Sequence, residues 1–361
     1  MHSILRSLLA LLIALGALLG APAQARQVTD MLGRTVTVPD HPTRVFGAAP
    51  PTTALLYTLA PDTVIGLNMP FPRAAKGLVP ERIFTLPVLG SSMAHGRQAN
   101  PEEVLSLQPD LVVAWGGKLP PGADAEHIAA QYARIGVPVV FVRLDTLEDW
   151  PAAYAFIGKL LGREARAQAL GGYVSDALAR VRAAVADIAP TRRVAVYYAE
   201  GAGGLATECD TSFHTEAIIL AGGRNVLSCT PTSAVGLEPV SLEQVLAWQP
   251  EVIVAQTPGM ARKVAEDARW HDLPAVHDGR ILEVPRLPFN WIDRPPSFTR
   301  ALGIQWLAHA FYPDRFPLDL NAEVRRFYQL FLGVDLDEAA LERVLTLMPA
   351  QGNASSGPKT H

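Results

Sequence analysis

The segment EEVLSLQPDLVVA at residues 102–114 recurs as EQVLAWQPEVIVA at residues 243–255, at a constant offset of 141 residues. Each copy is typical of a short helix, a stop at a proline and a strand of consecutive Val, Ile, Leu and Ala. A strand that is apolar at every position is typical of a parallel sheet covered by helices on both faces. The repeat therefore predicts two α/β halves built on one plan.

Further predicted elements surround each copy of the repeat. Each half opens with a strand, at residues 44–47 and 193–199, and each strand leads into a helix, at residues 52–59 and 215–221. Later in each half comes another helix–strand step, at residues 125–143 and 264–284. We expect two Rossmann-like α/β lobes with a ligand cleft between them, because loops at the carboxyl ends of parallel strands form binding sites.

The stretch between the two halves predicts a single long α-helix that joins the lobes. Residues 147–188 are rich in Ala, Leu and Arg at helical spacing, Pro190 ends the pattern, and a kink is expected at Gly171-Gly172. The predicted division is a signal peptide at 1–25, an N-terminal lobe at 26–145, the connecting helix at 146–189, a C-terminal lobe with terminal helices at 190–348, and a disordered tail at 349–361.

The N-terminus predicts export. A short basic region with Arg6 precedes an uncharged apolar run at residues 8–21, and Ala23-Gln24-Ala25 supplies a small-x-small cleavage pattern. The alternative is a membrane anchor, but the run of about 14 residues is shorter than the ~18–20 needed to cross a bilayer. No Cys follows the run, which argues against lipid attachment. We expect a periplasmic protein that begins at Arg26.

Charge and cysteine content restrict the chemistry. The net charge is −4 and no basic tract is present, which excludes nucleic acid as an expected partner. The two cysteines, Cys209 and Cys229, are predicted to form a disulfide in an oxidising compartment, with free or metal-binding thiols as the alternatives.

Four features together resemble the class III periplasmic substrate-binding proteins, which serve importers of iron–siderophore complexes, haem, cobalamin and some oxyanions. They are the opening Asp30-Met31-Leu32-Gly33-Arg34 followed by Pro42-Thr43-Arg44, the doubled Glu-x-Val-Leu repeat, the single bridging helix, and Ser212-Phe213-His214-Thr215-Glu216 with the Gly222-Gly223 segment. The resemblance covers roughly residues 28 to 310.

The resemblance implies a monomeric receptor without enzymatic activity or cofactor. Its ligand would sit between the lobes, and its partners would be an ABC permease and ATPase at the inner membrane. The acidic residues expected to dock on the permease match Glu102 and Glu243. Taken alone, each is a glutamate in the first turn of a predicted helix, where the helix dipole favours a carboxylate for stability.

Loops at the predicted strand ends nominate the ligand contacts. The segment at residues 286–296 carries two arginines, Asn290 and Trp291, and arginine forks suit carboxylate, phosphate or oxyanion oxygens. The alternative is that Asp293 pairs with an arginine and that Trp291 belongs to the core. The expected ligand-binding residues are Thr52, Thr53, His95, Arg97, Trp115, Tyr198, Arg262, Asn290, Trp291 and Arg294. No metal site is expected, because no paired His motif is present; convergence of His95, His214 and Cys209 on iron or haem is the open alternative.

The predicted function is the capture of an iron complex, a siderophore or haem, for import. A molybdate or tungstate oxyanion, or cobalamin, is the alternative ligand on the same scaffold. A secreted metal-dependent enzyme is a third hypothesis, but the sequence displays no nucleophile elbow, Walker loop or dinucleotide fingerprint.

Overall fold

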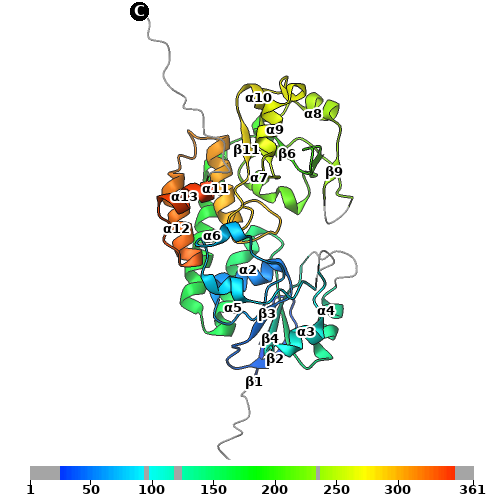
Figure 1. The fold of residues 1–361 in the computed structure, drawn as a ribbon, viewed down its shortest axis with the longest axis vertical. Coiled ribbons are helices and arrows are strands. Elements are labelled where there is room, and N and C mark those ends of the chain that lie inside the picture. The colour runs from blue at the N-terminus through cyan, green and yellow to red at the C-terminus, as the bar shows by residue number, and fades with distance from the viewer. Residues whose placement is uncertain (1–24, 93–96, 118–123, 233–235, 346–361) are drawn as a thin grey trace, which may run out of the picture.

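The computed structural model describes residues 25–92, 97–117, 124–232 and 236–345. The predicted signal peptide, apart from Ala25, and the predicted tail lie outside these residues, as does His95. Figure 1 shows two lobes, one above the other, with α6, α11, α12 and α13 along one side of the molecule. Among the helices that the structure describes, none combines the length and apolarity needed to span a bilayer.

The N-terminal lobe is built on a parallel sheet of three strands. β3 (Val45–Gly47), β4 (Leu111–Trp115) and β5 (Val139–Val142) lie in the order β3-β4-β5, and every residue of these strands is buried. α2 (Pro50–Leu59), α3 (Pro101–Ser106) and α4 (Ala125–Ala133) accompany the sheet. The strand predicted from the first copy of the repeat is thus the centre of this sheet.

An antiparallel hairpin precedes this sheet and was absent from the sequence prediction. β1 (Ala25–Thr29) pairs with β2 (Thr35–Pro39). At the turn, Oδ1 of the buried Asp30 accepts hydrogen bonds from the backbone N–H groups of Leu32 and Arg34, at 3.0 and 2.9 Å, and Oδ2 accepts one from Phe141 N at 3.2 Å. Asp30 therefore fixes the turn and ties the hairpin to β5.

The C-terminal lobe repeats the parallel design with four strands. β6 (Ala195–Ala199), β8 (Arg224–Asn225), β10 (Val252–Ala255) and β11 (Ile281–Glu283) lie in the order β11-β10-β6-β8. Its helices include α7 (Glu216–Leu220), α8 (Leu242–Trp248), α9 (Met260–Glu266), α10 (Pro274–His277) and α11 (Arg300–Phe311). A short ladder joins β7 (Ala206–Thr207) to β9 (Glu238–Pro239). The predicted mixed α/β fold with parallel sheets is confirmed.

The connecting segment differs from the prediction in where the helix breaks. The long helix is α6 (Glu164–Val185), and it continues through Gly171-Gly172 without a break. The residues before it form a separate helix, α5 (Trp150–Leu161), which ends at Gly162 in the left-handed conformation (φ +66°). A left-handed glycine is a common helix terminator, so the break follows from Gly162 rather than from the double glycine.

α5 folds back along α6 as a helical hairpin. A Cβ on Gly158 would lie 2.4 Å from Cβ of Ala167, and one on Gly171 would lie 3.2 Å from Cα of Pro151. The two helices therefore run antiparallel and approach closely at small residues, which gives the connection more stiffness than one isolated helix would have.

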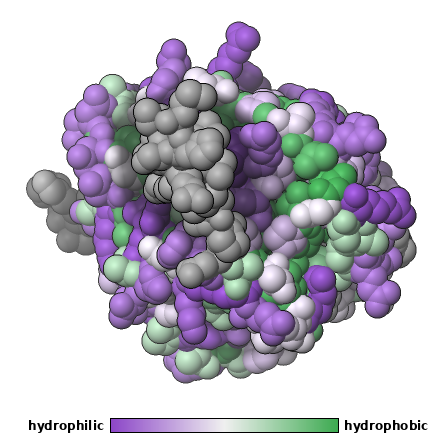
Figure 2. All heavy atoms as spheres, turned by 90° about the horizontal axis from the view of Figure 1, so that it is seen from below, coloured by the Kyte–Doolittle hydropathy of each residue, from purple (hydrophilic) through white to green (hydrophobic). Residues whose placement is uncertain are grey.

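The terminal helices contact the N-terminal lobe as well as the C-terminal one. α12 (Leu320–Leu332) packs against both α2 and α6, and Arg343 of α13 (Glu338–Leu345) donates hydrogen bonds to the backbone oxygens of Ala74 and Lys76 at 2.7 and 2.8 Å. One hydrophobic core, which includes Val45, Trp150 and Phe327, runs through both lobes and this helical layer. Seen from the end formed by the N-terminal lobe, hydrophilic side chains cover most of the described surface (Figure 2).

Candidate functional site

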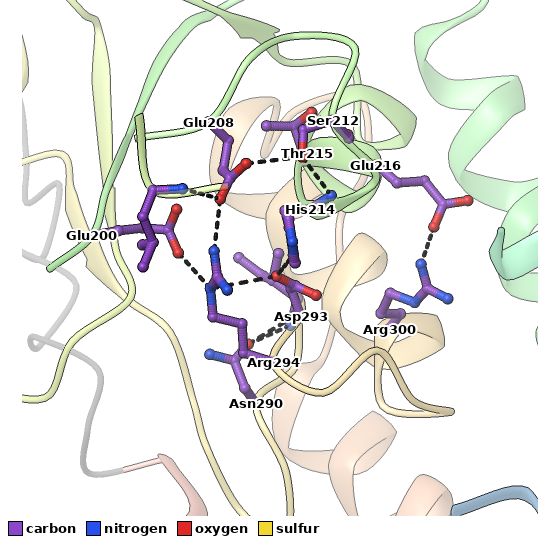
Figure 3. A network of polar contacts seen from close by, with 12 residues as sticks. Glu200, Glu208, Ser212, His214, Thr215, Glu216, Asn290, Asp293, Arg294 and Arg300 are labelled. Carbon is purple, nitrogen blue, oxygen red and sulfur yellow. Dashed lines mark hydrogen bonds and ion pairs between the residues drawn. The ribbon is translucent and has the colours of Figure 1, made fainter. Parts of the chain in front are cut away.

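A buried ionic network lies where the strands of the C-terminal lobe end. Glu200 directly follows β6, Glu208 follows β7, and Arg294 comes from the loop after β11 (Figure 3). Nε of Arg294 lies 2.7 Å from Oε1 of Glu200, and Nη2 lies 2.6 Å from Oε1 of Glu208. Both glutamates are fully buried, whereas the Arg294 side chain is 21% exposed. Arg294 thus pairs with buried carboxylates while part of its own side chain remains accessible to solvent.

Two further side chains complete the network. Nδ1 of His214 contacts Oδ2 of Asp293, which also lies 3.7 Å from Nε of Arg294. Ser212 donates a hydrogen bond to Oε2 of Glu208 at 2.8 Å. Arg294 itself has a positive φ of 55°, a conformation that side-chain-bearing residues rarely adopt. Backbone strain of this kind is common at functional sites, where surrounding contacts hold it in place.

The pKa values of Glu200, His214 and Arg294 are all raised in this network. Burial raises the pKa of Glu200 to about 8, against the hydrogen bond from Arg294, which lowers it, while the nearby Glu208 raises it further. Burial lowers the pKa of His214, but the hydrogen bond with Asp293 outweighs burial and leaves the pKa above its ordinary value. The pKa of Arg294 is also raised, because its carboxylate partners outweigh burial. Contacts with carboxylates thus favour the cationic form of both Arg294 and His214.

A pocket of about 500 Å³ opens beside Arg294, between residues 69–74 of the N-terminal lobe and residues 286–295 of the C-terminal lobe. Its lining consists mainly of apolar residues and three arginines. The lining residues are Met69, Pro70, Pro72, Ala74, Arg286, Leu287, Pro288, Phe289, Asn290, Arg294, Pro295 and Arg343. A concave, mostly apolar pocket of this size with a few polar groups is typical of a small-molecule site.

Asn290 and Arg294 are the expected ligand-binding residues that line this pocket. Oδ1 of Asn290 accepts hydrogen bonds from the backbone of Ile292 and Asp293 at 2.8 and 3.0 Å, so Asn290 also shapes the loop that carries Arg294. Arg286 lines the pocket too and donates a hydrogen bond to the backbone oxygen of Gln256.

Three other predicted contacts in the C-terminal lobe lie elsewhere. Trp291 is fully buried and donates a hydrogen bond from Nε1 to the backbone oxygen of Leu287 at 3.1 Å, so it belongs to the core, as the alternative reading of the sequence had it. Tyr198 is also fully buried, because it points from β6 into the core. The side chain of Arg262 is 75% exposed and lies 3.9 Å from Glu266 on the surface of α9.

Thr52 and Thr53, two of the predicted contacts, form hydrogen bonds within the N-terminal lobe. Thr52 is fully buried and exchanges hydrogen bonds with the backbone of Ala49 at the start of α2. Thr53 donates to Oδ1 of Asn68 at 2.6 Å, and Nδ2 of Asn68 donates to the backbone oxygens of Gly47 and Gly90 at 2.9 and 2.8 Å. Sequence reasoning missed Asn68, which clamps the strand-end loops together.

Trp115 and Arg97 are placed outside the pocket. Nε1 of Trp115 donates a hydrogen bond to Oδ1 of Asp145 at 3.0 Å, and its side chain is almost fully buried. Arg97 forms an exposed ion pair with Glu103 at 2.8 Å and donates to the backbone oxygen of Val88 at 2.6 Å. Neither residue lines the pocket beside Arg294.

Among the residues that the structure describes, the cysteines and histidines form no shared site. Cys209 and Cys229 are joined in a disulfide with Cα atoms 5.0 Å apart. A disulfide sulfur is not a thiolate metal ligand, so the alternative of His95, His214 and Cys209 around iron loses Cys209. Within the described residues, no group of three or more His, Cys, Asp or Glu is arranged to hold a metal ion.

The two glutamates of the repeat lie on the outside of their lobes. Glu102 in α3 and Glu243 in α8 are both exposed, and each occupies the first turn of its helix. Hydrogen bonds with its own backbone N–H and with Ser241 hold the pKa of Glu243 below its ordinary value. Glu243 therefore remains ionised at neutral pH.

Glu200, Glu208 and Asp293 belong to the buried network but are absent from the sequence-based list, as are the pocket arginines Arg286 and Arg343. Asp293 was considered only as a partner of a neighbouring arginine. The sequence signal available for Glu200 was its position directly after a predicted strand. Glu208 also follows a strand, but that strand, β7, is too short to show a hydrophobic periodicity by which it could be recognised.

Comparison with known proteins agrees with this architecture. The sequence matches the periplasmic binding protein family over residues 85–287. A solved ABC transporter solute-binding protein from Sulfurospirillum deleyianum is 36% identical, with a TM-score of 0.82 over 89% of this chain and 99% of that one. The molybdate-binding protein MolA of Haemophilus influenzae is 28% identical over 85% of this chain and 90% of its own length. A vitamin B12-binding protein of Vibrio parahaemolyticus is 26% identical over 58% of this chain and 70% of its own length. The chain therefore belongs to the periplasmic binding protein family, and it is a binding protein rather than an enzyme.

Proposed function

We propose that this periplasmic solute-binding component of an ABC transporter captures an iron complex, a ferric siderophore or haem, in the pocket beside Arg294. The predicted signal peptide at residues 1–25 would direct its export. The observation that carries the proposal is the lining of the pocket: three arginines, mostly apolar residues otherwise, and no carboxylate among the described lining residues. Such a surface favours a bulky organic ligand with negative charge.

The apolar part of the pocket supports an organic complex rather than a bare ion. Met69 and Pro70 stand on the N-terminal side, and Pro288, Phe289 and Pro295 stand on the C-terminal side. These side chains offer area for van der Waals contact with a chelate or a macrocycle, and the volume of about 500 Å³ lies in the range of small-molecule sites.

The three arginines supply the complementary charge. Arg286, Arg294 and Arg343 come from different segments, so a ligand among them would contact cationic groups on more than one side. Arginine remains charged at every physiological pH and donates several hydrogen bonds in a fixed plane. Ferric complexes of catecholates or carboxylates, and the propionates of haem, carry the negative oxygens that such groups bind.

A molybdate or tungstate oxyanion is the second candidate. The observation that favours it is the similarity to MolA, which extends over 90% of that protein's length. A compact oxyanion is bound best by a small, closed set of donors, whereas this pocket is wide and largely apolar. Cobalamin is a further ligand to test, because vitamin B12-binding proteins are also relatives.

Delivery of the solute would proceed by docking on the permease through Glu102 and Glu243. Both are exposed on the two lobes, and an ionised carboxylate on each lobe can pair with arginines of a partner.

A thermal-shift and calorimetric titration of the chain from Arg26 onward tests the proposed ligand. The panel contains ferric citrate, a ferric tris-catecholate complex, haem, cobalamin, molybdate and tungstate. A ligand at 100 times its Kd stabilises the folded state by about 2.7 kcal/mol, which raises Tm by several degrees. We expect the largest rise with a ferric complex or haem.

Two matched arginine variants locate the binding site. Arg286→Gln removes a pocket arginine, whereas Arg262→Gln removes an arginine whose side chain is 75% exposed on α9, outside the pocket. We expect at least tenfold weaker binding for the first and no change for the second. A rise in Tm with molybdate alone would move the ligand to the second candidate, and equal affinity of both variants would exclude this pocket.

A further inference from the structure

Glu200 and Glu208 both contact Arg294, but their surroundings are unequal. Glu208 accepts three hydrogen bonds: from Nη2 of Arg294 at 2.6 Å, from the backbone N–H of Leu237 at 3.1 Å and from Oγ of Ser212 at 2.8 Å. Three donors stabilise an ionised carboxylate in a buried place. Hydrogen-bond donors therefore reach both carboxylate oxygens of Glu208 (Figure 3).

Glu200 has much weaker support for a negative charge. Its Oε1 accepts one hydrogen bond, from Nε of Arg294 at 2.7 Å, while its Oε2 is buried and has no hydrogen-bond partner in the structure. Its side chain is fully buried. A buried carboxylate oxygen without a donor costs free energy that a proton on the carboxyl group removes.

The charges around Glu200 also favour its protonated form. The titratable groups around Glu200 are Glu208 and Arg294 in its immediate network, Tyr197 and Tyr198 of β6, which interact with it electrostatically, and Asp293 with His214 beside Arg294. Both glutamates contact the same arginine, Arg294, whose Nε also lies 3.7 Å from Oδ2 of Asp293. Arg294 then balances only one of the two glutamates, and carboxylates that share one counter-charge in a buried site tend to hold one proton between them.

We propose that Glu200 is a proton-carrying residue of the binding site, which retains its proton when an anionic solute contacts Arg294. This inference rests on the proposed function, in which an anion reaches Arg294 from the pocket. The solute adds negative charge beside the guanidinium, so the loaded site is neutralised by a proton on Glu200. When Glu200 ionises, its carboxylate competes with the solute for Arg294, and the solute is held less tightly.

The direction of the pH dependence follows from this coupling. The pKa of Glu200 is about 8 without ligand, and a bound anion raises it further. Below both values the carboxyl group is protonated in both states and binding exchanges no proton. Between them, binding takes up one proton, and affinity falls by up to about tenfold for each unit of pH increase.

Infrared spectroscopy of the ligand-free protein tests the proton itself. We expect the carbonyl stretch of a protonated carboxyl group at neutral pH, disappearing as the pH rises through about 8 and absent in Glu200→Gln. Glu323→Gln is the matched control, since Glu323 is a buried glutamate on α12 that is hydrogen-bonded to Tyr173 and is not among the residues that line the pocket. A spectrum in which Glu200→Gln removes no such band would overturn the proposal.

Calorimetry with a ferric tris-catecholate complex and with molybdate tests the coupling. Titrations in buffers of different ionisation enthalpy, at about pH 7 and about pH 9, give the number of protons taken up. We expect uptake approaching one proton and weaker binding at the higher pH, both abolished in Glu200→Gln and kept in Glu323→Gln. Binding that is equally pH-dependent in Glu200→Gln would refute the coupling. If neither probe binds, the proposed function fails, while the infrared titration still decides whether Glu200 holds the proton.

Discussion

Nη2 of Arg294 lies 2.6 Å from Oε1 of Glu208, although the two residues come from loops 86 positions apart in the sequence. Arg294 adopts a positive φ of 55° at this point, and the carboxylate of Glu208 is fully buried. The contact therefore holds the loop after β11 in a conformation that the backbone alone disfavours, and it fixes Arg294 at the wall of the pocket.

Replacement of Arg294 by Met is expected to destabilise the protein by about 3–5 kcal/mol, because it leaves buried carboxylates without their counter-charge. Urea denaturation at neutral pH measures the change. The combined variant Arg294→Met, Glu200→Gln, Glu208→Gln removes the unpaired charges together with the arginine and should recover much of the loss. A single variant as stable as the parent would show that the network contributes nothing to folding.

The stability of the protein should also fall with pH through the titration of Glu200. Its pKa is raised from 4.5 to about 8, so the folded state keeps a proton that the unfolded state loses first. The stabilisation from this group is complete below about pH 4.5 and is lost as the pH rises to about 8, by at most ~1.4 kcal/mol per pH unit. Denaturation at several pH values should show a flatter profile for Glu200→Gln than for the parent protein. Parallel profiles would contradict the raised pKa.

The duplicated segment predicts the fold well because its two signals are local. A continuous apolar strand and a helix that stops at a proline are encoded in about a dozen residues, and both copies appear as α3 with β4 and α8 with β10. The break at Gly162 was misplaced because a glycine terminates a helix only where the chain adopts the left-handed conformation, and the helix interior tolerates Gly171 where Pro151 approaches closely.

The site was only partly predictable, since burial depends on how the loops fold back. Arg294 and Asn290 were found because an arginine-rich loop with prolines follows the last strand of the lobe. Trp291 in the same loop turned inward, where its indole N–H is satisfied by the backbone of Leu287. Glu208 is placed near Arg294 because β7 pairs with the residue after β6 through the Glu200–Ala206 bridge, and this juxtaposition has no local sequence pattern.

Loss of the Cys209–Cys229 disulfide should lower the free energy of unfolding by about 3 kcal/mol, since the bond closes a loop across a sequence separation of 20 residues. Denaturation of the Cys209→Ser, Cys229→Ser variant measures this loss. Adding reductant to the variant is the control and should change nothing further. The loop also begins directly after Glu208, so ligand affinity should weaken together with stability. Full stability of the variant would contradict the prediction.

Reversal of the charge at Glu102 or Glu243 should impair delivery of the solute without changing its capture. Both side chains are exposed, each on a different lobe, and neither lines the pocket. We expect Glu102→Arg and Glu243→Arg each to weaken association with the permease by roughly tenfold or more, because the added positive charge would repel the arginines expected on the permease, while the solute Kd stays unchanged. Solute uptake into proteoliposomes that contain the transporter, together with calorimetry of the isolated receptor, separates the two effects.

Glu164→Arg is the matched control, since Glu164 is also an exposed glutamate in the first turn of a helix but lies on α6, in the connecting layer. Because docking on both lobes at once should be required, the double variant should lose uptake almost completely; uptake equal to that of Glu164→Arg would mean that the permease is recognised through another surface.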